Sequence, residues 1–233
     1  MKGLLYKELY LLKNGLIFTA AFQAIMTGIC ISLSMIGSDS TLTIIVITAC
    51  YYLSFLILSL VNQEIFTHDE KRPWNDFVSS TPQTARGQIA GKYYMILIEN
   101  LVLLFCCYLT DIFVVCIADN VLVSTIAAGM IIFCLRIIAY AIEIPFIIRF
   151  GSNVGAAVKG ALLAFLMLIL LCYGLFGDIS FLFGDDPAAA FIAFINSENV
   201  IWIIVLIPYI AVCAYYLSYC ISVKLYEEAD CYE

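Results

Sequence analysis

Six long apolar stretches, separated by short polar segments, dominate the pattern of the chain. Each is about 20 residues or longer, which is the length an α-helix needs to cross the hydrocarbon core of a membrane. The predicted spans are Leu16–Ile36, Leu42–Asn62, Met95–Ala118, Val121–Glu143, Ala157–Phe176 and Val200–Val223. The connections at Gly37–Thr41 and Asp119–Asn120 are so short that the helices flanking each one must be antiparallel neighbours. The pattern predicts an all-α fold, an integral membrane bundle of six transmembrane helices in a single domain, residues 1–233.

Two segments outside the spans have amphipathic or capped helical patterns. In the opening "MKGLLYKELYLLKNG", Leu5, Leu9 and Leu12 share one helical face. This spacing predicts an interfacial helix over residues 1–15 that ends at a break at Asn14–Gly15, although a charged flank that merely orients the first span is the alternative. Residues 177–199 contain an Asp–Pro helix start followed by an Ala-rich run, which predicts a short outer helical segment before the last span.

Residues 63–94 form the longest predicted inner connection, and they contain the densest charge cluster of the chain, "FTHDEKRPWNDFVSSTP". Pro73 suits the first turn of a helix, and Trp74, Phe77 and Val78 follow at a spacing that places them on one face. The Thr81-Pro82 pair ends that helix, because the residue before a proline avoids the helical conformation. The segment therefore predicts two short helices around a proline turn, with one apolar face and one charged face.

Charge distribution predicts the orientation of the bundle. Apolar residues make up 64% of the chain and charged residues 12%, far from the rough half and quarter of soluble domains. If residue 1 is cytoplasmic, all eleven Lys and Arg residues except Arg136 fall in cytoplasmic segments, with Lys159 counted at the inner end of its span, and the outer loops carry only acidic charges. This positive-inside bias predicts a multi-pass plasma-membrane protein with both termini in the cytoplasm. The net charge of -7 argues against nucleic acid as a partner.

Five polar residues lie within or at the ends of predicted spans, where ionisable groups are costly and often functional. They are Glu99, Asp111, Arg136, Tyr140 and Glu143. Reflection across the Asp119–Asn120 turn places Arg136 about four residues, or ~6 Å of rise, from the level of Glu99, so an ion pair is within reach. Arg136, Tyr140 and Glu143 share one helical face. They form either a polar seam that helps the cytoplasmic half of the bundle to move or a static contact that holds the helices together. Asp111 is expected to be protonated or to face a wet cavity.

Motifs for catalysis and cofactor binding are missing from the sequence. The single histidine, His68, lies in the charged connection, and neither a Walker A nor an H-E-x-x-H pattern occurs. The ten cysteines lie in predicted spans or in the C-terminal tail and read as small buried apolar residues. An intramembrane enzyme that pairs Asp111 with Asp178 is disfavoured because Asp178 is expected outside the bilayer. We expect no catalytic activity and no bound cofactor or metal.

The chain resembles the short permease subunits of the bacterial ABC-2 type export family. The similarity is carried by the opening "MKGLLYKELYLLK" and by a loop pattern of Phe66, Asp69-Glu70, Trp74, Thr81-Pro82 and Lys92-Tyr93. Within that family it is similar to permeases of the exporter for phenol-soluble modulins, which are amphipathic peptide toxins. The resemblance implies a separate ABC ATPase subunit, in two copies, that binds ATP and Mg. It also implies a second permease subunit, expected to form a homodimer, and a coupling helix in the 63–94 connection. The implied ATPase contacts are Phe66, Asp69, Glu70, Lys71, Arg72, Trp74, Asp76 and Phe77.

Two functions from different classes fit the sequence. The first is an ATP-driven export permease for hydrophobic or amphipathic substrates, peptides foremost, although lipids and hydrophobic drugs also fit the oily interior. The second is a membrane-embedded binding or immunity protein that sequesters a peptide without transport. They differ over the aromatic residues of the connection, because only the permease needs Trp74 and Phe77 to contact an ATPase.

Overall fold

The structure, a computed structural model, describes residues 2–35, 40–70, 85–118, 126–176 and 198–230, and these residues are helical throughout except for Gly151. The helices are α1 (Lys2–Met35), α2 (Ser40–Glu70), α4 (Ala85–Ala118), α5 (Ile126–Phe150), α6 (Ser152–Phe176) and α8 (Glu198–Asp230). The described part of each predicted span falls on one of these helices, which confirms the all-α prediction for the described part of the chain.

Five of these helices contain a stretch that is long and apolar enough to cross a membrane. The stretches are Leu9–Leu33, Val46–Gln63, Arg86–Val114, Ala128–Phe150 and Val205–Glu227. Within the described residues, α6 is not among them, so the predicted span at Ala157–Phe176, and with it the count of six, stays a prediction. The apolar stretches of α1 and α8 are the least buried of the five. This is expected if lipid or a protein partner covers them.

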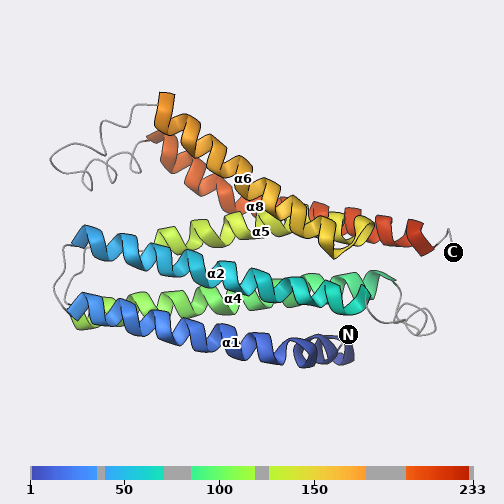
Figure 1. Cartoon of the computed structure of the whole chain (residues 1–233), viewed down its shortest axis with the longest axis horizontal. Helices are drawn as coiled ribbons and strands as arrows, with labels where there is room; N and C mark the ends of the chain where they lie inside the picture. The colour runs from blue at the N-terminus through green and yellow to red at the C-terminus, as the bar shows by residue number, and fades with distance from the viewer. Residues whose placement is uncertain (1, 36–39, 71–84, 119–125, 177–197, 231–233) are drawn as a thin grey trace.

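The helices form two groups of three (Figure 1). In the N-terminal block, α1 packs against α2 and α4, and in the C-terminal block, α5 packs against α6 and α8. The blocks meet mainly where α2 and α4 contact α5 and where α4 contacts α8. Both termini lie at one end of the bundle, here called the terminal end. Toward the opposite, far end, α6 and α8 diverge from the other helices.

The first helix runs from Lys2 to Met35 without interruption, so the predicted break at Asn14–Gly15 is wrong. Gly15 serves close packing instead. A Cβ atom at this position would lie 2.5 Å from Cγ1 of Val61, so only glycine lets α1 approach α2 this closely. Three residues earlier, Leu12 is fully buried, which shows that the first turns of α1 contribute to the core.

The long connection predicted over residues 63–94 is much shorter in the structure. The α2 helix continues to Glu70 and α4 begins at Ala85. Hydropathy marks where a helix leaves the membrane rather than where it ends, because charged residues are good helix formers in water. The remaining segment, 71–84, lies outside the described residues, as do most of the predicted outer helical segment at 177–199 and the segment 119–125.

A single residue joins α5 to α6. Gly151 has a φ of 89°, the left-handed conformation that glycine adopts most readily after a helix end. Its N–H donates to the carbonyl oxygen of Ile147 at 2.8 Å. A Cβ atom on Gly155 would collide with the side chain of Ile147, so this glycine lets α6 fold back on α5. The cytoplasmic segment predicted between Glu143 and Ala157 is therefore a helix joint instead of a loop.

Two main clusters of buried side chains fill the bundle. The terminal cluster joins both blocks, with members from α1, α2, α4, α5 and α8: Leu12, Val61, Ile65, Phe66, Ile89, Tyr93, Met95, Ile96, Tyr140, Ile144, Ile147 and Val223. The far cluster has all its buried members in the N-terminal block: Cys30, Ile47, Cys50, Tyr51, Phe55, Leu58, Leu103, Leu104, Cys107 and Val114. Its three cysteines are buried free thiols, in agreement with their prediction as small buried apolar residues, whereas Cys116, Cys213 and Cys220 are exposed, against that prediction.

Candidate functional site

Phe66 is the one predicted ATPase contact whose side chain the structure describes. It lies in α2, is 5% exposed, and belongs to the terminal cluster. The ammonium group of Lys92, from α4, lies 4.7 Å from the centroid of its ring. This cation–π contact ties the last turns of α2 to the first turns of α4. Phe66 therefore holds together the two helices that frame the 71–84 segment, and its contact with an ATPase stays a prediction.

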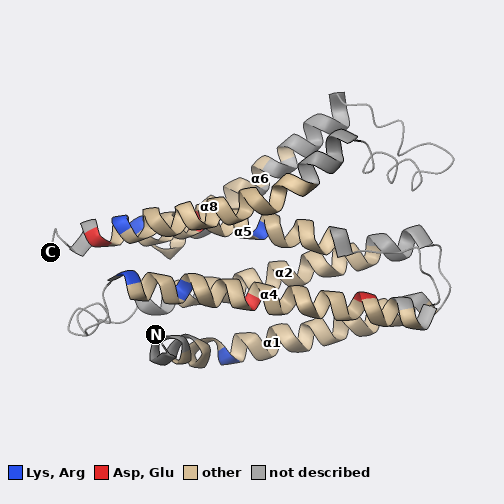
Figure 2. Cartoon of the chain, turned by 180° about the vertical axis from the view of Figure 1, so that it is seen from behind, with Lys and Arg blue, Asp and Glu red and all other residues tan. Residues whose placement is uncertain are grey.

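The other predicted ATPase contacts lie around the end of α2. Asp69 and Glu70 are its last two residues. Lys71, Arg72, Trp74, Asp76 and Phe77 lie outside the described residues, so their contact with an ATPase stays a prediction. The structure does place both flanking helix ends at the terminal end of the bundle, together with most of the described Lys and Arg residues (Figure 2).

Three of the predicted intramembrane polar residues lie in one polar seam, formed by Asn62 on α2, Arg136, Tyr140 and Glu143 on α5, and Lys159 on α6. The amide Nδ2 of Asn62 donates to the Tyr140 hydroxyl at 3.0 Å. Arg136 lies over the ring of Tyr140, with Cζ 4.9 Å from the centroid. Nζ of Lys159 lies 3.7 Å from Oε1 of Glu143. The shared helix face predicted for Arg136, Tyr140 and Glu143 is thus confirmed.

The seam contains two cations and one carboxylate. Nε and Nη2 of Arg136, as well as Oε2 of Glu143, are buried without a hydrogen-bond partner among the described residues. Lys159 also donates to the backbone carbonyl of Ser59 on α2, at 3.4 Å. Buried charges cost several kcal/mol each unless their partners satisfy them, so this incompletely bonded set is expensive to maintain. Such an arrangement is typical of a functional site, and it connects α2 of one block to α5 and α6 of the other.

Glu99 and Arg136 do not form the ion pair that their levels allow. Leu97 of α4 packs against a small buried cluster that includes Cys134 and Ile137 of α5. Glu99 and Arg136 therefore lie near the same level. Glu99 comes two residues after Leu97, however, which rotates it by ~200° around α4. The carboxylate of Glu99 therefore faces α1, whereas Arg136 lies over Tyr140. The two residues lie near the same level, as the reflection across the turn predicted, but their side chains face different helices.

Asp111 is hydrogen-bonded to Tyr51 of α2. The Tyr51 hydroxyl lies 2.7 Å from Oδ1 of Asp111 and 2.9 Å from the carbonyl oxygen of Cys107. A hydroxyl has one proton to donate and accepts through its oxygen. The Tyr51 hydroxyl donates toward both oxygens, so its one proton is shared between Oδ1 of Asp111 and the carbonyl oxygen of Cys107. The two alternatives for Asp111, a protonated acid or contact with a wet cavity, stay predictions.

Sequence reasoning missed two groups of polar residues. Lys159 was expected in the cytoplasm but is 8% exposed inside the seam. Between α4 and α8, the Tyr93 hydroxyl lies 2.6 Å from Oγ of Ser218 and 2.8 Å from Oγ of Ser222. The Tyr215 hydroxyl donates to the backbone carbonyl of Tyr93 at 2.8 Å. The spacing of Tyr215, Ser218 and Ser222, at i, i+3 and i+7, was a readable signal of one polar face in an apolar helix.

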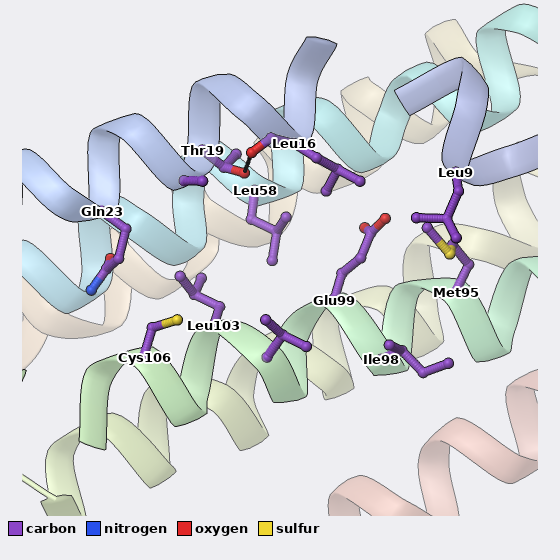
Figure 3. A pocket seen from close by; sticks show the side chains of 12 residues that line it. Leu9, Leu16, Thr19, Gln23, Leu58, Met95, Ile98, Glu99, Leu103 and Cys106 are labelled. Atoms are coloured by element: carbon purple, nitrogen blue, oxygen red, sulfur yellow. Dashed lines mark hydrogen bonds between the residues drawn. The ribbon is translucent and has the colours of Figure 1, made fainter. Parts of the chain in front are cut away.

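A cavity of about 390 Å³ lies between α1 and α4 (Figure 3). Here it is called the α1–α4 groove. Its lining is mostly apolar, and Glu99 and Gln23 project into it from opposite helices. The residues that line it are Leu9, Leu16, Thr19, Ala20, Gln23, Leu58, Met95, Ile98, Glu99, Val102, Leu103 and Cys106. Among the described residues, no group of three or more His, Cys, Asp or Glu side chains is arranged to hold a metal ion.

Comparison with protein families identifies the class of the molecule. Residues 3–227 match the family described as "ABC-2 family transporter protein". Because this match covers nearly the whole chain, the protein belongs to the ABC-2 transporter family, and it is a transmembrane permease component of an ABC transporter. No curated protein and no solved structure gives a match.

Proposed function

We propose that the chain is the permease subunit of an ATP-driven exporter that moves hydrophobic or amphipathic substrates, foremost peptides, out of the cell. The observation that carries this proposal is the family match over residues 3–227, combined with the long apolar helices of the described residues. ATP and Mg are bound by a separate ABC ATPase, because the chain lacks a phosphate-binding motif of its own. Membership of the ABC-2 family implies an ABC ATPase as the partner of this chain.

The working unit is proposed to contain two permeases, as a homodimer, and two ATPases. Both termini and the 71–84 segment are placed in the cytoplasm on the basis of the positive-inside bias. Two features of the structure support this arrangement: the termini share one end of the bundle, and most of the described Lys and Arg residues gather there. The broad apolar surfaces of α1 and α8 offer area for the second permease and for lipid.

Coupling to ATP hydrolysis is proposed to pass through the 71–84 segment. Trp74 and Phe77 supply the apolar anchors, surrounded by charged neighbours, that are typical of a binding hot spot. The flanking helices α2 and α4 are tied by the contact between Lys92 and Phe66. From α2, the hydrogen bond between Asn62 and Tyr140 leads into α5. A displacement of the segment therefore reaches the seam, where two arrangements of the charges provide the two states that transport requires.

The test is co-expression with a candidate ABC ATPase, followed by purification in detergent and measurement of stoichiometry and ATP turnover. Trp74→Ala/Phe77→Ala is expected to abolish co-purification and to return ATP turnover to that of the ATPase alone. The matched control is Phe105→Ala/Phe113→Ala, because it also removes two aromatic rings, both exposed on α4 away from the segment. This control is expected to retain the complex.

Two outcomes would overturn the coupling proposal. One is that the double variant binds the ATPase as tightly as the unchanged chain does. The other is that no ATPase associates with either protein. The second outcome would favour the sequestering function, in which the chain binds a peptide and needs no energy source.

A further inference from the structure

The α1–α4 groove opens toward the surroundings of the bundle instead of toward its core. Val102 is 57% exposed and Ile98 is 47% exposed, and both lie at its rim on α4. Ala20 is exposed on the α1 side. Leu58 of α2 and Leu103 of α4 are buried and close its floor. A molecule dissolved in the hydrocarbon layer can therefore enter the groove sideways, between α1 and α4.

Hydrogen-bond acceptors in the groove come from Thr19, Gln23 and Glu99, and Nε2 of Gln23 is a donor beside them. Thr19 donates its only side-chain proton to the carbonyl oxygen of Leu16, at 2.9 Å, so its oxygen remains as an acceptor. Gln23 is 7% exposed, and its Oε1 atom is buried without a hydrogen-bond partner. Glu99 adds a carboxylate from the opposite helix (Figure 3). No Lys or Arg is present among the lining residues.

We propose that the α1–α4 groove is a binding site for a hydrophobic organic cation. Its volume of about 390 Å³ lies within the ~300–1,000 Å³ that is usual for small-molecule sites, toward the small end. The apolar walls contact the body of the ligand, while Glu99 and Gln23 face its positive charge. An anion of the same size is excluded, because it would be brought next to a carboxylate in surroundings of low dielectric constant, where repulsion is strong. Binding does not depend on the proposed export function.

The experiment measures equilibrium binding to the purified full chain, without an ATPase, in phosphatidylcholine nanodiscs. The probes are tetraphenylphosphonium and tetraphenylborate, which have nearly the same size and shape but opposite charge. We expect saturable binding of tetraphenylphosphonium only. Glu99→Gln is expected to weaken that binding at least tenfold. The matched control is Asp111→Asn, which replaces the other buried acid of α4, outside the groove, and keeps an oxygen that can accept from Tyr51, so its affinity should stay within twofold.

A second pair of variants tests the groove with Glu99 in place. Ala20→Phe fills the mouth and is expected to abolish binding, whereas Ala21→Phe, on the neighbouring exposed position outside the lining, is expected to leave it unchanged. The proposal is overturned if Glu99→Gln binds the cation as the unchanged chain does, if the two Phe variants behave alike, or if tetraphenylborate binds equally well. A failure of ATPase association in the earlier experiment would leave all of these expectations standing.

Discussion

Near the terminal end the two blocks are joined by buried hydrogen bonds, whereas nearer the far end they touch through aromatic and apolar side chains. In the terminal half, Asn62 donates to Tyr140, and Tyr93 contacts Ser218 and Ser222. In the far half, the ring of Phe55 meets that of Phe133 edge-on at 6.4 Å. The described contacts therefore differ in kind, although both halves are well packed.

This difference indicates which half of the interface can move. Hydrogen bonds have a narrow range of distances and angles, so a buried set of them limits how far the blocks can slide past one another. Apolar contact is non-directional and tolerates sliding. The helices α6 and α8 diverge from the others toward the far end, which is the half where the blocks meet through apolar side chains (Figure 1). We expect the terminal half to act as the pivot and the far half to open.

The largest loss of stability is expected from Lys159→Met, in the polar seam. It leaves the carboxylate of Glu143 buried without its nearest cation, which costs about 3 kcal/mol. Thermal unfolding in detergent measures the loss. The double variant Lys159→Met/Glu143→Gln removes both charges and is expected to recover more than half of it. A double variant as unstable as the single one would show that the pair matters less than the volume of the lysine.

Tyr93→Phe is expected to lower the free energy of unfolding by about 1–2 kcal/mol. The change removes the hydroxyl that contacts both Ser218 and Ser222, and interhelical hydrogen bonds in membranes contribute roughly 0.6–2 kcal/mol each. Tyr209→Phe is the control, because this tyrosine is exposed on the same helix α8. Equal stability of the two variants would contradict the view that the terminal half is held by hydrogen bonds.

A smaller effect, about 1 kcal/mol, is expected for Phe133→Leu in the far half. The variant keeps an apolar side chain but loses the edge-on ring pair with Phe55. ATP turnover of the co-purified complex should remain near that of the unchanged chain, because sliding of apolar surfaces does not need this ring. Phe105→Leu, at an exposed position of α4, serves as the control for loss of a ring. A complete loss of turnover with Phe133→Leu would assign the far half a directional role.

The smallest effect is expected for Arg86→Ala. Nε of Arg86 lies 3.0 Å from Oε1 of Glu227 at the terminal end, but both side chains are exposed to about half or more. Exposed ion pairs contribute roughly 0–1 kcal/mol, and salt screens them. We expect a decrease of less than about 0.5 kcal/mol that disappears at high salt. A large decrease in the free energy of unfolding that persists at high salt would show that surface contacts, more than buried hydrogen bonds, stabilise the terminal half.

Much of the helix arrangement could be predicted from the sequence, because the length and apolarity of a span are local properties. Helix ends were harder to predict, since α2 and α4 continue through charged residues beyond their apolar spans. The direction of each polar side chain depends on the rotation of its helix, which is set by packing against neighbours. For this reason the level of Glu99 relative to Arg136 was predictable and its face was not. Lys159 was misassigned for the same reason, because burial against α2 and α5 is not visible in a one-dimensional pattern.

The one-residue joint at Gly151 has a mechanical consequence. No loop separates α5 from α6, and Gly155 packs closely against Ile147. The angle between the two helices is therefore set at Gly151. We expect a rotation of α5 at the seam to carry α6 with it, and the resulting displacement to grow toward the far end of α6. A spectroscopic label on α6 would therefore report the orientation of α5 with amplification.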